Sequence, residues 1–279
     1  MSRRTWGHSL AALAMVAGVT FAVPQGIAAQ PDREPERVDA WVQRVIYTSE
    51  FGVDRPTGLT VDPDSNLFYV IDSARNKLVG LTPFEDPADD IVDVSITDPL
   101  NVVLDTASRR VLTLSGGALK ARPIGGGTSA VVARLDIADA RGITADPATG
   151  DVYVLDGTNP RIFKIGASGV ESRITIRELA DTELRGIAYN PGNDRVYVAS
   201  PTDQTLYEVD QSGDVLAIFD LAAAELEDPQ ALSFAASIDN TDDPAAMSLL
   251  IADGGGRIVE MSLEAQPLAV AAASTSNLV

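Results

Sequence analysis

The sequence contains no cysteine and a single histidine, His8. Without cysteine the chain has no disulfide, no thiolate nucleophile and no cysteine-ligated zinc site. His8 lies in an N-terminal segment that we expect to be removed on export, so the mature chain would lack histidine as well. A Ser-His-Asp triad is then excluded, because its general base is missing. Any catalysis or metal binding would depend on oxygen ligands, with lysine and arginine as the cations.

Basic residues are few. The chain has 21 Lys and Arg against 40 Asp and Glu, which gives a formal net charge of −19. Nucleic-acid-binding proteins need a basic face that displaces counterions from phosphates. No stretch of this sequence concentrates lysine and arginine, so we expect no nucleic-acid partner. An acidic surface is instead typical of a soluble exported protein that tolerates salt.

Long hydrophobic runs are missing except for Leu10–Val23. Arg3 and Arg4 precede this run, and the small residues of Ile27–Ala29 follow it, which is the pattern of a signal peptide. The run is too short for a comfortable membrane span. We therefore predict that residues 1–29 are a signal peptide and that the mature protein is periplasmic or extracellular, with no membrane span. Removing the segment would move the formal net charge from −19 to about −21.

The main positive feature of the chain is an internal repeat. Its five copies start at Gly58, Asn101, Gly142, Gly186 and Ala231, which are 43, 41, 44 and 45 residues apart. A period in the low forties that is built from short strands is typical of β-propeller blades. We therefore predict an all-β fold, a β-propeller of five four-stranded blades. Six blades are the alternative, which would need about forty further residues.

Each copy contains three predicted strands, which are Gly58–Val61, Leu67–Ile71 and Lys77–Leu81 in the first copy. Between the first two strands stand residues such as Asp146-Pro147 and Gly150, where proline and glycine favour a hairpin turn. The linkers between copies predict a fourth, outer strand in each blade. These outer strands are Ile91–Ile96, Val131–Ile137, Ser172–Leu179 and Val215–Leu221.

No such linker follows the fifth copy. In Trp41–Tyr47 apolar and polar residues alternate enough to predict a strand. This strand can supply the missing outer strand of the last blade and so pair the two ends of the propeller. Closure of the ring removes exposed strand edges. Leu268–Ala272 is the alternative closing strand. We therefore place the propeller at residues 41–270, a disordered lead-in at 30–40 and a flexible tail at 271–279. Because aromatic residues make up only 5% of the chain, we expect a core of aliphatic side chains.

Acidic residues recur at two repeat positions that would meet at one face of a propeller. One position lies three residues before each start, and the other ends each second strand. The candidate metal ligands at these positions are Asp98, Asp139, Glu183, Asp228, Asp72, Asp156 and Asp253. Ca²⁺ takes six to eight oxygen ligands, so a mouth lined by carboxylates predicts a calcium site. The alternative is structural, because an Asp before Pro or Gly caps a turn by bonding its own backbone.

Four polar residues at or just before the repeat starts are candidates for ligand binding. Arg141 and Arg185 can orient an anionic group of a ligand. Gln230 and Asn101 occupy neighbouring positions and add hydrogen-bonding side chains. These residues favour either a small polar ligand or a protein partner.

The run Tyr69–Leu78 (YVIDSARNKL) resembles the NHL repeat, whose blades carry Y-V-A-D-S, a short loop, and then a basic and an aliphatic residue. Tyr153–Gly157 with Arg161-Ile162 has the same arrangement, as does Leu250–Gly254 with Arg257-Ile258. The chain is also similar to the broader group of gluconolactonase-like and YncE-like exported propellers. This resemblance implies the propeller fold. In the lactonase-like relatives it also implies a divalent metal held by Glu, Asn and Asp at the mouth of the central channel.

From these features we predict an exported, monomeric protein that binds a ligand or a protein without catalysis. The alternative is a metal-dependent, lactonase-like hydrolase, in which a cation such as Ca²⁺ at the carboxylate mouth activates water. Ca²⁺ is the only cofactor that either prediction includes.

Overall fold

The computed structural model describes residues 34–63, 65, 67–82, 102–105, 108–115, 117–124, 126–137, 139–157, 159–237 and 246–264. The chain divides into two units, residues 1–33 and 34–279, and the described residues all belong to the second. Several predictions therefore lie outside the described residues. These are the signal peptide, the outer strand Ile91–Ile96, the alternative closing strand Leu268–Ala272, the tail, and the site candidates Asp98 and Asn101.

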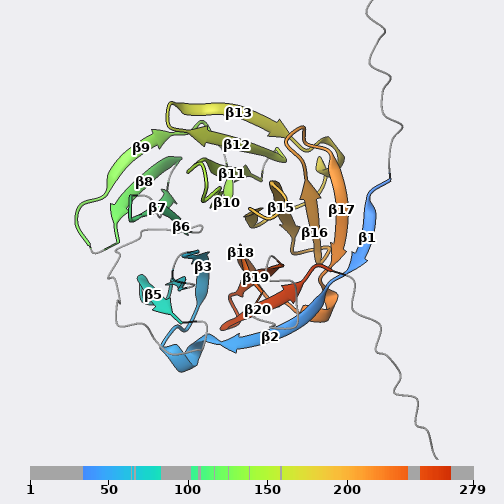
Figure 1. The fold of residues 1–279 in the computed structure, drawn as a ribbon, viewed down its shortest axis with the longest axis horizontal. Coiled ribbons are helices and arrows are strands. Elements are labelled where there is room, and N and C mark those ends of the chain that lie inside the picture. The colour runs from blue at the N-terminus through green and yellow to red at the C-terminus, as the bar shows by residue number, and fades with distance from the viewer. Residues whose placement is uncertain are drawn as a thin grey trace, which may run out of the picture. The chain divides into compact units, whose positions relative to one another are not determined.

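The described residues of the second unit form five sheets, arranged as the blades of a β-propeller (Figure 1). Blade 1 contains β3 (Pro56–Val61), β4 (Phe68–Asp72) and β5 (Lys77–Leu81). Blade 2 contains β6 (Val102–Asp105), β7 (Arg110–Ser115), β8 (Ala118–Pro123) and β9 (Ala130–Arg134). Blade 3 contains β10 (Ala140–Ala145), β11 (Val152–Asp156), β12 (Arg161–Gly166) and β13 (Gly169–Thr175). The predicted five-bladed propeller is confirmed.

The last two blades each include a strand from the N-terminal side of the chain. Blade 4 contains β14 (Ile187–Asn190), β15 (Arg195–Ser200), β16 (Thr205–Val209), β17 (Val215–Asp220) and β1 (Glu36–Asp39). Blade 5 contains β18 (Pro229–Ala236), β19 (Met247–Asp253), β20 (Arg257–Ser262) and β2 (Trp41–Tyr47). The remaining regular structure among the described residues is three 3-10 helices, Thr48–Phe51, Arg177–Leu179 and Ala222–Ala224.

Of the two N-terminal strands, β2 closes the ring, and β1 is an additional strand that the sequence did not predict. As predicted, β2 pairs antiparallel with β20, so the outer strand of blade 5 comes from the other end of the propeller. The predicted disordered lead-in at residues 30–40 does not hold for Glu36–Asp39. This segment forms β1 and pairs in parallel with β17. Figure 1 shows the blue strands β1 and β2 running along orange β17 and red β20, so one continuous segment spans two blades.

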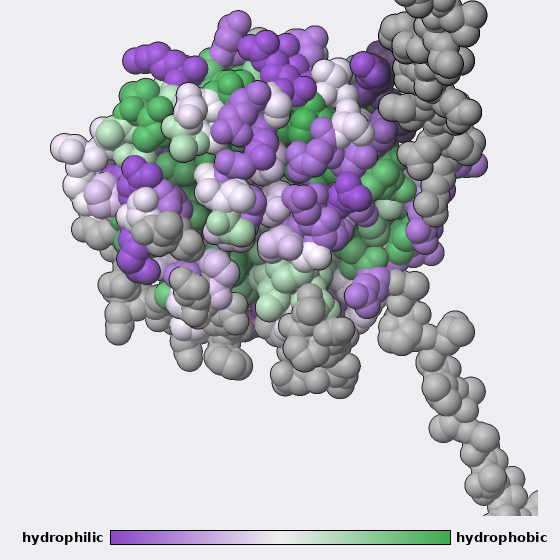
Figure 2. Space-filling model, turned by 45° about the horizontal axis from the view of Figure 1, so that its top comes forward, coloured by the Kyte–Doolittle hydropathy of each residue, from purple (hydrophilic) through white to green (hydrophobic). Residues whose placement is uncertain are grey.

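The core lies between the blades. The buried apolar side chains fall into five clusters, and each cluster is shared by two neighbouring blades. The second strands β4 and β11 are buried along their whole length, because both of their faces pack against another blade. The outer strand β13 is mostly exposed. Figure 2 shows that hydrophilic residues cover much of the visible surface, with smaller hydrophobic patches between them.

The predicted hairpin turns are present between the first and second strands. In blade 3 the Asp146 carboxylate accepts hydrogen bonds from the backbone N–H of Ala148 at 2.8 Å and from the Thr149 hydroxyl at 2.7 Å. In blade 4 the Asn190 side-chain oxygen accepts one from the N–H of Gly192 at 2.9 Å. These turns fix the end of each inner strand, and they place a proline beside the channel at three blades.

Candidate functional site

The start of the inner strand has the same irregularity in three blades. The strand register shifts between Pro56 and Gly58, between Ala140 and Gly142, and between Pro229 and Ala231. A bulge of this kind leaves the extra residue unpaired and changes the direction of its side chain, which no longer follows the regular alternation of a strand. The extra residues are Thr57, Arg141 and Gln230, and the last two are predicted ligand-binding residues. The repeat itself therefore places these side chains at the mouth of the channel.

Asp228 is the centre of one group of polar side chains at this mouth, which we call the Asp228 cluster. Its carboxylate lies 3.3 Å from a guanidinium nitrogen of Arg55 and 3.3 Å from one of Arg185. It also accepts a hydrogen bond from the Gln230 side-chain amide. Arg55, Arg185 and Asp228 come from three different repeats, so the cluster links blades 1, 4 and 5. Both predicted ligand-binding residues of this cluster, Arg185 and Gln230, are thus engaged by Asp228.

A second group, the Arg141 cluster, joins Asp139 and Glu183, the other two described acids that lie three residues before a repeat start. The Arg141 Nε lies 2.7 Å from the Asp139 carboxylate, and another nitrogen of its guanidinium lies 3.9 Å from Glu183. Glu183 also accepts a hydrogen bond of 3.4 Å from the Thr202 hydroxyl. Positive and negative side chains therefore alternate around this end of the channel.

The acidic residues that end the second strands are anchors of the fold. Asp72, Asp156 and Asp253 are fully buried. Asp253 accepts the backbone N–H groups of Glu227 at 3.1 Å and Asp228 at 2.7 Å, and the Arg257 Nε at 2.9 Å. Burial by itself would raise the pKa of the Asp253 carboxyl, but these donors together hold its pKa below 3.8. The carboxylate thereby ties the loop before the inner strand to the end of the second strand.

Asp156 and Asp72 each have one kind of donor that Asp253 has, an arginine side chain for Asp156 and backbone N–H groups for Asp72. Asp156 accepts two hydrogen bonds from Arg161, at 3.0 and 2.8 Å. Asp72 accepts the backbone N–H groups of Arg55 at 3.2 Å and Ala74 at 3.1 Å. Asp72, Asp156 and Arg161 are among the positions on which the resemblance to the NHL repeat depends, and here they stabilise the junction between strands.

The described residues do not fit the predicted calcium site. Asp139, Glu183 and Asp228 already face arginines, and Asp72, Asp156 and Asp253 point into the strand junctions. Within the described ranges no group of three or more Asp, Glu, His or Cys side chains could hold a metal ion. Ca²⁺ needs six to eight oxygens that are free to converge. Asp98, the seventh candidate ligand, lies outside the described residues.

A cavity of 230 Å³ lies in the channel, at the opposite ends of the inner strands from the two charged clusters. All five inner strands contribute to its lining, and Met247 of β19 adds a flexible thioether. Three prolines from the strand turns stand around it, Pro63, Pro147 and Pro191. None of the described lining residues is an acid, a lysine, an arginine or a histidine. This cavity is therefore largely apolar and is not the polar mouth that the sequence predicts.

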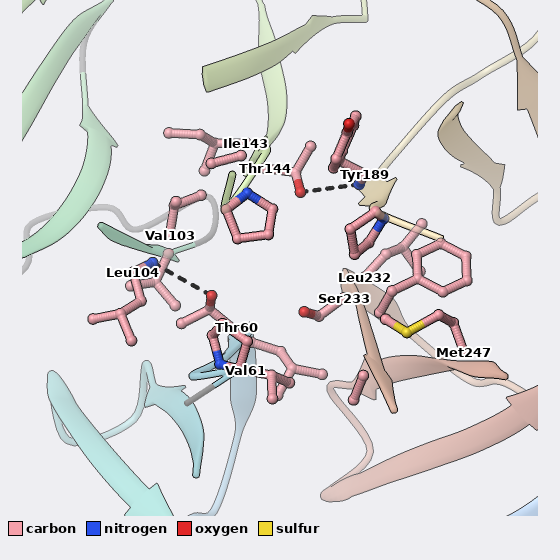
Figure 3. A pocket seen from close by; sticks show the side chains of 18 of the residues that line it. Thr60, Val61, Val103, Leu104, Ile143, Thr144, Tyr189, Leu232, Ser233 and Met247 are labelled. Atoms are coloured by element: carbon pink, nitrogen blue, oxygen red, sulfur yellow. Dashed lines mark hydrogen bonds between the residues drawn. The ribbon is translucent and has the colours of Figure 1, made fainter. Parts of the chain in front are cut away.

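Three hydroxyl groups interrupt the apolar lining. Thr60, Thr144 and Ser233 lie two residues after the start of their repeats, on β3, β10 and β18. Figure 3 shows their oxygens facing the middle of the pocket from three sides. The Thr144 hydroxyl oxygen accepts the backbone N–H of Tyr189 at 3.1 Å, and that of Thr60 accepts the N–H of Leu104 at 3.4 Å.

Tyr189 brings a phenol to the rim of the cavity, but this phenol already has a partner. Its hydroxyl donates a hydrogen bond of 2.8 Å to Asp194. Its ring stacks on Tyr153, with the ring centres 5.5 Å apart. Burial, followed by this hydrogen bond and the nearby charge of Asp146, raises the pKa of Tyr189 well above its ordinary value. The phenol therefore stays neutral at physiological pH.

Sequence reasoning missed this cavity, although a signal for it exists. The residues two positions after the five repeat starts are Thr60, Val103, Thr144, Ala188 and Ser233, all small or medium in size and uncharged. When the same position of the inner strand is uncharged in every repeat, its side chains are expected to face the central channel of the propeller.

Comparisons with solved structures identify propellers as similar folds. The structure of Myxococcus xanthus glutaminyl cyclase matches with a TM-score of 0.58 and 16% identity, over 84% of this chain and 100% of that chain. A streptogramin B lyase matches with a TM-score of 0.51 and 12% identity, over 79% and 98%. A chain of a nidogen/laminin complex matches with a TM-score of 0.50 and 16% identity, over 72% and 73%. No protein-family model and no curated protein matches the sequence.

At these identities the similarity shows the fold alone. The similar structures include enzymes and a protein in a complex, which agrees with the many unrelated functions that propellers support. They confirm the propeller prediction, and the more specific assignment to the NHL repeat stays a prediction. Across the described part of the chain, no helix is long and apolar enough to cross a bilayer.

Proposed function

We propose that this chain is an exported binding module without catalytic activity, and that its central cavity holds an uncharged, largely apolar group of a small ligand. The observation that carries this proposal is the 230 Å³ cavity, whose described lining has aliphatic, proline and aromatic side chains and no charged one. Concave, mostly apolar pockets with a few polar groups are typical ligand sites. Export rests on the predicted signal peptide at residues 1–29.

The size and chemistry of the cavity support binding. An apolar cavity of about 150 Å³ is enough to hold benzene in another protein. A cavity of 230 Å³ has room for a somewhat larger body. Transfer of apolar surface from water into such a site contributes about 25 cal/mol per Å² of surface buried. A small uncharged ligand therefore has a clear driving force to enter.

The absence of a base beside the hydroxyls supports a role without catalysis. A nucleophilic Ser or Thr needs an adjacent group that takes its proton. The described residues that line the cavity with Thr60, Thr144 and Ser233 include no lysine, histidine, aspartate or glutamate. Because Tyr189 has a raised pKa, it is not a base at neutral pH.

Titration with tetralin, a compact bicyclic hydrocarbon, tests the proposal. We expect saturable binding with a Kd of about 0.1–1 mM, detected by protein NMR shifts confined to the inner strands. Ala145→Phe should abolish binding, because Ala145 lines the cavity. Ala130→Phe is the matched control, since Ala130 is exposed on the outer strand β9. Failure of tetralin to bind, or equal loss in both variants, would overturn the proposed function.

The alternative, a calcium-dependent hydrolase at the charged mouth, makes a different prediction. Calcium would then raise the melting temperature of the protein, and Asp139→Asn with Glu183→Gln would remove that effect. Because arginines already neutralise Asp139, Glu183 and Asp228, we expect no change in melting temperature with calcium. Tight binding of one calcium ion, with hydrolysis of a lactone, would favour the alternative.

A further inference from the structure

We propose that the ligand of the central cavity is a neutral molecule with a carbonyl-type oxygen, which the hydroxyls of Ser233, Thr60 and Thr144 hold by donating hydrogen bonds. This inference rests on the proposed function, because it names the chemical class that the same cavity takes. Each of these hydroxyl groups has one proton that it can donate to a ligand.

Thr60 and Thr144 are already used as acceptors. Each oxygen receives a backbone N–H from the inner strand of the next blade, Leu104 for Thr60 and Tyr189 for Thr144. A hydroxyl group has one proton to donate as well as its lone pairs. The structure shows no acceptor for either proton among the described residues. Both groups therefore enter the cavity as donors.

Ser233 is the third donor. It occupies the equivalent repeat position on β18, and its hydroxyl faces the middle of the pocket in Figure 3. In the part of the chain that the structure describes, this hydroxyl has no hydrogen-bond partner. A polar group beside an apolar cavity gains most from a ligand that supplies the missing partner. A carbonyl oxygen has two lone pairs, so it can accept from Ser233 and from one threonine together.

The same lining disfavours charged ligands. A carboxylate or phosphate needs a cation or several backbone N–H groups to compensate for its lost hydration. The described lining residues supply neither a lysine nor an arginine, and Arg141 and Arg185 belong to the charged clusters at the opposite ends of the inner strands. An ammonium group is disfavoured in the same way, because no carboxylate belongs to the described lining.

Three probes that share one bicyclic frame separate these chemistries. They are tetralin, which is a hydrocarbon, α-tetralone, which adds one ketone oxygen, and tetralin carboxylate, which adds a negative charge. We expect α-tetralone to bind about three- to tenfold more tightly than tetralin, as one or two added hydrogen bonds would give. We expect no binding of the carboxylate. The carbonyl carbon resonance of labelled α-tetralone should move downfield on binding, relative to its position in cyclohexane.

Ser233→Ala is the decisive variant, because it removes a donor that no described residue uses and should leave folding intact. The preference for α-tetralone over tetralin should fall by about threefold, and the carbonyl resonance should move back upfield. Ser172→Ala on the exposed outer strand β13 is the matched control and should change neither. Thr144→Val should act like Ser233→Ala, whereas Thr144→Ser, which keeps the hydroxyl, should retain the ketone preference.

The outcomes distinguish this inference from the proposed function. If neither tetralin nor α-tetralone binds, the proposed function fails and the inference fails with it. If both bind equally, or if the ketone preference survives Ser233→Ala unchanged, the cavity is a binding site but the hydroxyls do not select a carbonyl. Tighter binding of the carboxylate than of the ketone would also overturn the inference.

Discussion

The hydroxyl oxygen of Thr144 accepts the backbone N–H of Tyr189 at 3.1 Å, and so joins the inner strand of blade 3 to that of blade 4. Thr60 makes the equivalent bond to Leu104 between blades 1 and 2. Inner strands have an unpaired edge that faces the channel, and their N–H groups need partners there. The hydroxyl of each threonine therefore accepts a backbone N–H of the next blade and can still donate its own proton into the cavity.

Removing this bond should weaken the propeller by a limited amount. Thr144→Val keeps the shape of the side chain but leaves the N–H of Tyr189 without its partner. We expect the free energy of unfolding in urea to fall by about 1–2 kcal/mol. Thr144→Ser should lose less, since the hydroxyl remains. Equal stability of the wild-type and valine proteins would show that another group, such as water, satisfies this N–H.

Strand β1 should stabilise blade 4 from outside. It pairs in parallel with β17 from Glu36–Ala217 to Asp39–Asp220, and Val38 packs against the cluster between blades 4 and 5. We expect a chain that starts at Ala40 to be about 1–2 kcal/mol less stable than one that starts at Glu34. Hydrogen exchange should quicken in β17 and stay slow in β11 of blade 3. Unchanged exchange in β17 would show that the parallel pairing does not persist in solution.

Glycine is needed at the entry to β14 for two reasons that a matched pair of variants can separate. Gly186 has a φ of +84°, and a Cβ there would lie 3.1 Å from Leu232 Cγ. Gly150 has a φ of +77° but open space around its Cβ position. We expect Gly150→Ala to cost about 1–2 kcal/mol from backbone strain alone. Gly186→Ala should cost about 1–3 kcal/mol more, because Leu232 must also move. If urea unfolding shows a similar loss of stability for Gly150→Ala and Gly186→Ala, a Cβ at residue 186 is not crowded by Leu232.

The Asp253 anchor should make part of the stability dependent on pH. Its pKa is lowered in the folded protein, so its contribution is fully present above the unfolded value of 3.8 and is lost as the pH falls through the folded value. Asp253→Asn should lower the free energy of unfolding by about 2–4 kcal/mol at pH 7, because Arg257 would lose its partner.

The difference in the free energy of unfolding between Asp253→Asn and the wild type should become smaller below pH 4, as the Asp253 carboxyl of the wild type becomes protonated. Glu178→Gln, at an exposed position on a 3-10 helix, is the control and should change stability little at either pH. A difference that stays constant from pH 7 to pH 2 would contradict the assigned role of the Asp253 charge.

The sequence was sufficient for the features that repeat. Five copies spaced 41 to 45 residues apart predict five blades. Asp146-Pro147 with Gly150 predicts a turn, because a turn depends on local backbone preferences. The closing strand Trp41–Tyr47 could also be predicted, since one blade lacked an outer strand and an exposed edge is unfavourable. By contrast Glu36–Asp39 has no apolar alternation, and only the free edge of β17 makes it a strand.

The sequence by itself thus determined the fold class, the number of blades and the exclusion of cysteine chemistry. Tertiary structure alone decided what the polar residues do, because their partners come from distant repeats. Asp228 looks like a metal ligand in sequence and lies between Arg55 and Arg185 in space. The cavity exists only where five inner strands converge, so Thr60, Thr144 and Ser233 become neighbours through ring closure and not through any local preference of the chain.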